Sequence, residues 1–144
     1  MELLIDVKKR MIEEDLSCFA YLKVGTYTSQ YGGIRPLLQP INIDKDYFED
    51  AFVIDKVIGK SAAFLLIYSN VKKIHAFIMS EHAKNLLDLH NIPYSYDELV
   101  PYIQNNLKTG MCPMEQSVIH IDDPKLALVA LNTKVNELMK QKGL

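Results

Sequence analysis

The stretch Asp55-Lys56-Val57-Ile58-Gly59-Lys60-Ser61-Ala62-Ala63-Phe64-Leu65-Leu66-Ile67-Tyr68 decides the fold of this chain. From Val57 to Ile67 its only polar side chains are Lys60 and Ser61, and it contains too much alanine and leucine for a strand. An α-helix that is apolar on all sides must be covered by other parts of the protein. We therefore expect a buried central helix that begins at Asp55 or, if Gly59 ends a separate turn, at Lys60.

The polar residues of this stretch lie near the predicted start of the helix. Unpaired backbone N–H groups and the positive end of the helix dipole favour an anion there. Gly59-Lys60-Ser61 also resembles the end of a phosphate-binding P-loop, but Ile54 stands where the full pattern needs glycine, and no strand is expected directly before it. We predict that Lys60 and Ser61 hold a phosphate or carboxylate without the full motif. The alternative is that Lys60 is a solvated residue of the first turn.

Length and composition limit the class of protein. The chain has 144 residues, 49% of them hydrophobic, so we expect a single domain with a proper core over residues 1–144. A net charge of −2 gives no general reason to expect nucleic-acid binding. Two cysteines are too few for a disulfide framework and indicate a reduced, cytoplasmic protein. No apolar run approaches the roughly 20 residues of a membrane span, so no membrane partner is expected.

The remaining sequence alternates between strand and helix patterns. Strands are expected over residues 17–24, 26–30, 72–80 and 94–96. Helices are expected over residues 2–15, from the cap Ser80 to His90, weakly over 97–106, over 114–119 and over 122–142, with loop and short helical turns over 36–50. A hairpin followed by strand–helix–strand crossovers predicts a three-layer α-β-α sandwich with a mixed sheet and added N- and C-terminal helices.

Three further segments carry candidate site residues. Arg35 follows two glycines and precedes a proline, which would present its guanidinium to an anion or to a surface salt bridge. Ser80 and Glu81 begin a helix directly after a strand, where open α/β sheets bind their ligands, although helix capping alone also explains them. Cys112 stands near a short helix, where a lowered thiol pKa would make it nucleophilic, while a buried inert cysteine is the commoner case.

Metal chemistry has no support in the spacing of the residues. The four histidines are His75, His82, His90 and His120, and none stands at short ligand spacing from another histidine or a cysteine. No Gly-x-Ser-x-Gly elbow and no dinucleotide fingerprint occur. No metal ion or other cofactor is therefore expected.

Four segments together resemble a known family. They are Gly33-Ile34-Arg35-Pro36-Leu37-Leu38, Asp55 to Ala63, Ser80-Glu81, and Thr109-Gly110-Met111-Cys112-Pro113-Met114-Glu115. On these segments the chain resembles domain-of-unknown-function family 1893, an uncharacterised prokaryotic family with a cytidine-deaminase-like fold. The resemblance implies that fold and no established activity.

The motifs of true deaminases are missing. Those enzymes carry His-x-Glu or Cys-x-Glu at the start of one core helix and Pro-Cys-x-x-Cys at the start of the next, and both motifs gather zinc. Here the two positions read Gly59-Lys60-Ser61-Ala62-Ala63 and Ser80-Glu81-His82-Ala83-Lys84-Asn85. Without these ligands no metal-activated water forms, so zinc-dependent deamination is not expected.

The crevice between the two helix starts is the predicted site. Lys60, Ser61, Ser80 and Glu81 would line it and Arg35 would reach in, a setting that favours a small anionic ligand, nucleotide-like or phosphorylated. One alternative is an enzyme of unknown reaction that uses Cys112 as nucleophile, with Glu81 as the other catalytic candidate. The other is a non-catalytic interaction module that forms a homodimer.

Overall fold

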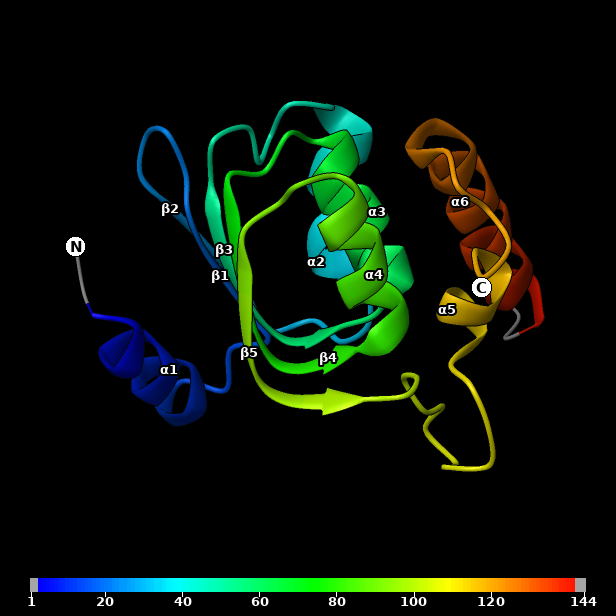
Figure 1. Cartoon of the computed structure of the whole chain (residues 1–144), viewed down its shortest axis with the longest axis horizontal. Helices are drawn as coiled ribbons and strands as arrows, with labels where there is room; N and C mark the ends of the chain where they lie inside the picture. The colour runs from blue at the N-terminus through cyan, green and yellow to red at the C-terminus, as the bar shows by residue number, and fades with distance from the viewer. Residues whose placement is uncertain (1–2, 142–144) are drawn as a thin grey trace.

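The computed structural model describes residues 3–141 as a five-stranded mixed sheet in the order β2-β1-β3-β4-β5 (Figure 1). The strands are β1 (Cys18–Tyr21), β2 (Thr26–Ser29), β3 (Phe52–Ile58), β4 (Lys73–Ser80) and β5 (Tyr94–Val100). β1 runs antiparallel to both β2 and β3, whereas β3, β4 and β5 are mutually parallel. The predicted hairpin and mixed sheet are confirmed.

The helices lie on both faces of this sheet. They are α1 (Leu4–Glu13), α2 (Arg35–Ile43), α3 (Lys60–Tyr68), α4 (Glu81–Leu89), α5 (Pro113–Ser117) and α6 (Pro124–Gln141). α1 covers one face, α2 to α4 cover the other, and α5 and α6 pack outside α3 (Figure 1). The predicted α/β class with helices on both faces of the sheet is confirmed.

The central stretch divides into a strand and a helix. Residues 55–58 belong to β3, and α3 begins at Lys60 after Gly59, whose backbone is extended with φ −96°. Of the two predicted helix starts, Lys60 is confirmed and Asp55 is wrong, as is the expectation that no strand precedes Gly59. Residues 52–55 pair with β1 on one side, and the strand pairs with β4 from Phe52 to Ile58 on the other, so the sheet holds this segment extended.

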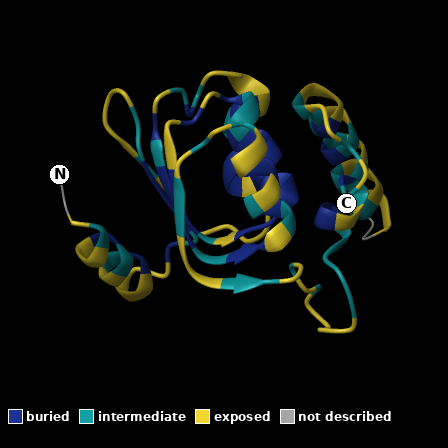
Figure 2. Ribbon diagram, in the orientation of Figure 1, coloured by how far each residue is buried: buried dark blue, intermediate teal, exposed yellow. Residues whose placement is uncertain are grey.

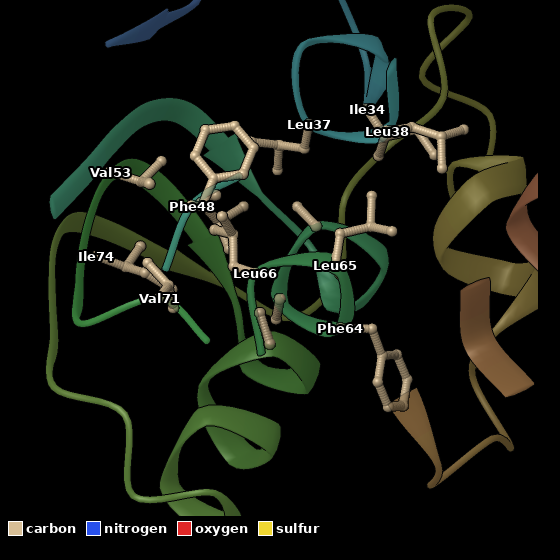
Figure 3. Packing of buried hydrophobic residues seen from close by; sticks show 14 of the residues in the cluster. Ile34, Leu37, Leu38, Phe48, Val53, Phe64, Leu65, Leu66, Val71 and Ile74 are labelled. Atoms are coloured by element: carbon tan, nitrogen blue, oxygen red, sulfur yellow. The ribbon is translucent and has the colours of Figure 1, made fainter. Parts of the chain in front are cut away.

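Burial explains why α3 is apolar on all sides. Every residue from Lys60 to Leu66 is buried, and α3 is dark blue around its circumference where α4 and α6 keep exposed faces (Figure 2). In the core, Leu66 points toward Phe48 and Val53, while Leu65 lies toward Leu38 (Figure 3). The predicted buried central helix is confirmed for residues 60–68.

The segment 36–50 is more regular than predicted, since α2 forms in spite of Pro40 inside it. A proline lacks the N–H that would bond to the carbonyl four residues earlier. That carbonyl belongs to Pro36, and it accepts a hydrogen bond from the Tyr27 hydroxyl at 2.7 Å. A side chain of β2 thus replaces the missing backbone donor, which the local sequence could not show.

The weak helix predicted over residues 97–106 is wrong, because β5 continues to Val100. Parallel pairing with β4 holds this segment extended. Asp97 also pairs with Lys8 of α1 at 2.6 Å and lies 3.3 Å from Nε2 of the buried His75. These tertiary contacts override a helical pattern that Pro101 already weakens. No helix among residues 3–141 is long and apolar enough to cross a membrane.

Candidate functional site

The starts of α3 and α4 lie at the same edge of the sheet, because β3 and β4 are parallel and each runs directly into its helix. Ser80 caps α4, with its Oγ accepting a hydrogen bond from the Ala83 N–H at 3.1 Å. Gly59 caps α3 and has no side chain to do the same. The two helix starts thus lie together as predicted, with donors from both facing the space between them.

Glu115 of α5 fills this crevice with its own carboxylate. Its Oε1 accepts a hydrogen bond from the Lys60 N–H at 3.1 Å and from the Ser80 hydroxyl at 2.5 Å. Its Oε2 accepts from the Ile103 N–H at 2.6 Å. The residue is 1% exposed. The anion that two helix N-termini favour is therefore supplied by the chain itself.

Gly59 makes this close approach possible. A Cβ built at Gly59 would lie 2.9 Å from the Ile103 side chain and 3.2 Å from Glu115 Oε1. The φ of Gly59 is ordinary for any residue, so the glycine is required by space and not by backbone conformation. The Gly-Lys-Ser sequence that resembles a P-loop is in fact the packing surface for Glu115.

Lys60 turns away from the crevice. Its Nζ donates a hydrogen bond to the Ile119 carbonyl at 2.8 Å and lies 5.4 Å from the centre of the Phe64 ring. The side chain is 9% exposed, and burial lowers the pKa of its ammonium group. Lys60 therefore ties α3 to the segment that joins α5 and α6.

A cavity of about 320 Å³ lies beside Glu115. Its wall combines the Gly32–Ile34 loop, the end of β3, the first turn of α3 and parts of residues 103–115. Polar groups from separate parts of the chain meet there: Asp55, Ser61, Gln104, Asn106, Cys112 and Glu115. Ser61 is 4% exposed, and no hydrogen bond joins its hydroxyl to another residue in the described part of the chain. This cavity is the candidate site.

Asp55 is the unusual group of the cavity wall. It is 6% exposed, and its Oδ1 accepts a hydrogen bond from the Val57 N–H at 3.1 Å. Burial raises the pKa of its carboxyl to about 7. Cys18 lies directly opposite Asp55 in the sheet, and burial followed by the neighbouring Asp55 carboxylate raises the pKa of the Cys18 thiol. Cys18 is thus an inert thiol, and Asp55 is the titratable group of this pair near neutrality.

The residues predicted from the sequence do not all converge. Ser61 and Cys112 line the cavity, whereas Arg35, Lys60, Ser80 and Glu81 do not. Arg35 is exposed, with its guanidinium carbon 4.9 Å from the centre of the Tyr31 ring. Glu81 is exposed in the first turn of α4. Ser80 is fully buried beneath Glu115, where it serves as cap and donor.

Asp55 and Glu115 are the two acids of the cavity wall, and the sequence did not single out either for the site. One of the two helix starts that the sequence predicts makes Asp55 an N-cap, which is an ordinary role for an acid. Reading residues 52–58 as a strand would have moved Asp55 beside the carboxyl edge of the sheet. No local signal places Glu115, because 55 residues separate it from Lys60.

Comparison with known proteins gives the family. Residues 6–135 match the family model described as a domain of unknown function, DUF1893. The chain belongs to this family. A crystal structure of a DUF1893 family protein from Thermotoga maritima, TM1506, is 32% identical to it, with a TM-score of 0.82 over 92% of this chain and 89% of that one. No significantly similar curated protein was found. Family membership supports the fold and leaves the function to be argued from the site.

Proposed function

We propose that this DUF1893 protein binds a small polar ligand in the cavity beside Glu115. The observation that carries the proposal is the meeting of Asp55, Ser61 and Cys112, from β3, α3 and the start of α5, around one cavity of about 320 Å³. Ligand sites are typically concave, mostly apolar and provided with a few convergent polar groups, at volumes of about 300–1,000 Å³. This cavity lies at the lower end of that range, so the buried part of the ligand is small.

Glu115 changes where a charged ligand would place its anionic group. The sequence predicts a nucleotide-like or phosphorylated ligand with its anion at the helix starts, and the Glu115 carboxylate holds that position. A second anion there would meet like charge. In this proposal the anionic group lies beside Lys56, the lysine of the cavity wall, and the neutral end of the ligand enters the cavity.

Thermal unfolding in the presence of nucleotides, sugar phosphates and small neutral heterocycles tests the proposal. A ligand that binds only the folded state raises the unfolding free energy by RT ln(1 + [L]/Kd), about 2.7 kcal/mol at a hundredfold excess over Kd. We expect at least one compound at millimolar concentration to raise the melting temperature. If no compound does so, ligand binding is wrong.

Two glycines supply a matched pair of variants. A Cβ at Gly32, in the cavity wall, and one at Gly110, outside it, would each meet no atom within 4 Å. Gly32→Phe should fill the cavity mouth and abolish the ligand-induced rise in melting temperature. Gly110→Phe should leave that rise unchanged, so equal responses of the two variants would place the ligand elsewhere.

A nucleophilic role for Cys112 is the second candidate, favoured by its half-buried position in the cavity wall. The cations expected to activate it lie elsewhere, since Lys60 bonds to Ile119 and Arg35 stacks on Tyr31. Rapid labelling of Cys112 by iodoacetamide at pH 7, blocked by a cavity ligand, would support this enzyme hypothesis. Labelling no faster than that of a free peptide thiol would contradict it.

A further inference from the structure

Asp55 is a buried acid of the cavity wall. In the described part of the chain its carboxylate takes part in no ion pair, and the neighbouring Lys56 pairs with Asp15 instead, with Nζ 3.6 Å from Oδ1. Glu115, on the same wall, is also negative but receives three hydrogen bonds. The two acids give the cavity wall a negative character that Lys56, on the same wall, offsets in part.

A carboxylate in this position gains from any further donor. Removal from water disfavours its charged form unless hydrogen bonds or a cation compensate. A carboxylate can accept about four hydrogen bonds. The Val57 N–H, the Cys18 thiol and the Lys56 N–H use part of that capacity. Because β1 and β4 flank Asp55 within the sheet, the cavity is the side from which another donor can approach.

We propose that Asp55 determines the specificity of the cavity by selecting ligands whose buried end presents N–H donors, such as an amidine, an amine or an amide. A carboxylate or phosphate at that end would face Asp55 and Glu115 together and would be rejected. Ser61, with its unpartnered hydroxyl, supplies a group that can accept from or donate to the same ligand. This inference rests on the proposed ligand binding and adds the chemical class of the ligand.

Three probes of one shape and different charge test the inference: benzamidine, benzamide and benzoate. Each is titrated into ¹⁵N-labelled protein, and the shifts of Ser61 and Cys112 amide resonances report binding in the cavity. We expect benzamidine and benzamide to bind and benzoate not to bind. Benzamidine should bind about tenfold more tightly at pH 8 than at pH 6, since Asp55 with a pKa of about 7 is largely ionised only at the higher pH. Benzamide should show no such dependence.

Variants separate Asp55 from the general charge of the protein. Asp55→Asn should weaken the binding of benzamidine at pH 8 by at least about tenfold. It should also remove the pH dependence of that binding. Glu13→Gln, which removes one exposed acid from α1 on the opposite face of the sheet, should change neither. Thermal unfolding of both variants checks that they fold, and the pH dependence in the unaltered protein needs no variant at all.

The failures of the two proposals are distinguishable. If benzoate binds in the cavity as well as benzamidine does, or if Asp55→Asn leaves benzamidine binding unchanged, the selection by Asp55 is wrong while ligand binding stands. If none of the three probes shifts the cavity resonances at millimolar concentration, the selection by Asp55 is wrong. The proposal of ligand binding is also wrong only if no compound of the wider thermal screen raises the melting temperature.

Discussion

Two buried carboxylates, Glu115 and Asp55, line one cavity and differ in the groups that compensate their charge. Glu115 accepts hydrogen bonds from the backbone of α3, the capping serine of α4 and the Ile103 N–H. Asp55 has the Val57 N–H, the Lys56 N–H and a thiol, makes no ion pair with a described residue, and carries a pKa raised by burial to about 7. A carboxylate with several backbone donors stabilises a fold, whereas one left partly compensated beside a cavity is a candidate for function.

The starts of α3 and α4 hold an anionic side chain of the protein itself. Two N-termini that lie together favour an anion, and in this protein that anion is a side chain of α5. Glu115 therefore joins α3, α4 and the segment 101–112 at one point. Within the described chain the regular structure of this segment is one isolated bridge between Gln104 and Met111, so its contact with Glu115 is a main link to the two helix starts.

Removal of the Glu115 carboxylate should have the largest effect. Glu115→Ala leaves three buried donors without an acceptor, at about 1–3 kcal/mol each, so we expect unfolding free energy to fall by roughly 5 kcal/mol. Acetate should bind in the space that the substitution creates and restore part of the loss in a saturable manner. Urea unfolding with and without 100 mM acetate, compared at constant ionic strength, measures both effects.

The exposed Glu137 of α6 gives the control for this experiment. Glu137→Ala should change the unfolding free energy by less than about 1 kcal/mol, and acetate should not affect it. If Glu115→Ala is as stable as Glu137→Ala, the Glu115 carboxylate does not stabilise the fold, and the contrast with Asp55 is wrong.

Ionisation of Asp55 should make the unfolding free energy of the protein depend on pH. Its folded-state pKa of about 7 lies above the ordinary value of 3.8, so the folded state binds the proton more tightly than the unfolded state does. Its contribution to stability is therefore present below about pH 4 and lost as pH rises from there to 7, with a total of up to roughly 4 kcal/mol. Asp55→Asn should remove this slope and be more stable than the unaltered protein at pH 8.

Urea unfolding at intervals from pH 4 to pH 8 measures the Asp55 effect as a difference between the two proteins, which cancels the other titrating groups. Glu13→Gln again serves as control, because the exposed Glu13 should leave the slope unchanged. Parallel slopes for Asp55→Asn and the unaltered protein would mean that Asp55 is as well compensated as Glu115.

Gly59→Ala should have an intermediate effect. The added methyl group would lie 2.9 Å from Ile103 and 3.2 Å from Glu115, so one of them must move. We expect a loss of about 1–3 kcal/mol, the range for overpacking, and faster iodoacetamide labelling of Cys112 as the segment loosens. Gly110→Ala, where a Cβ meets nothing, is the matched control. Equal stability of these two variants would show that Glu115 does not need its close fit.

The sequence predicted those features that depend on local pattern. The apolar run of α3, the hairpin and the Ser80 cap each follow from residue types within a few positions, and the structure confirms all three. Features that depend on tertiary pairing were missed. The strand over residues 52–58 is stabilised by β1 and β4, and the crevice is filled by a residue 55 positions away from Lys60.

Substitution of Glu81 should have the smallest effect on stability. It tests whether the ligand binds between the helix starts or in the cavity. Its side chain is exposed in the first turn of α4, where a negative charge interacts favourably with the helix dipole by about 0.3–1 kcal/mol. Glu81→Gln should lower the unfolding free energy by no more than that, with the loss reduced by salt, and should leave ligand-induced stabilisation within about twofold in Kd. Urea unfolding and ligand titration at 50 and 500 mM NaCl measure both. A large loss of ligand binding in Glu81→Gln would return the site to the crevice between the helix starts, because Glu81 faces that edge of the sheet and does not line the cavity.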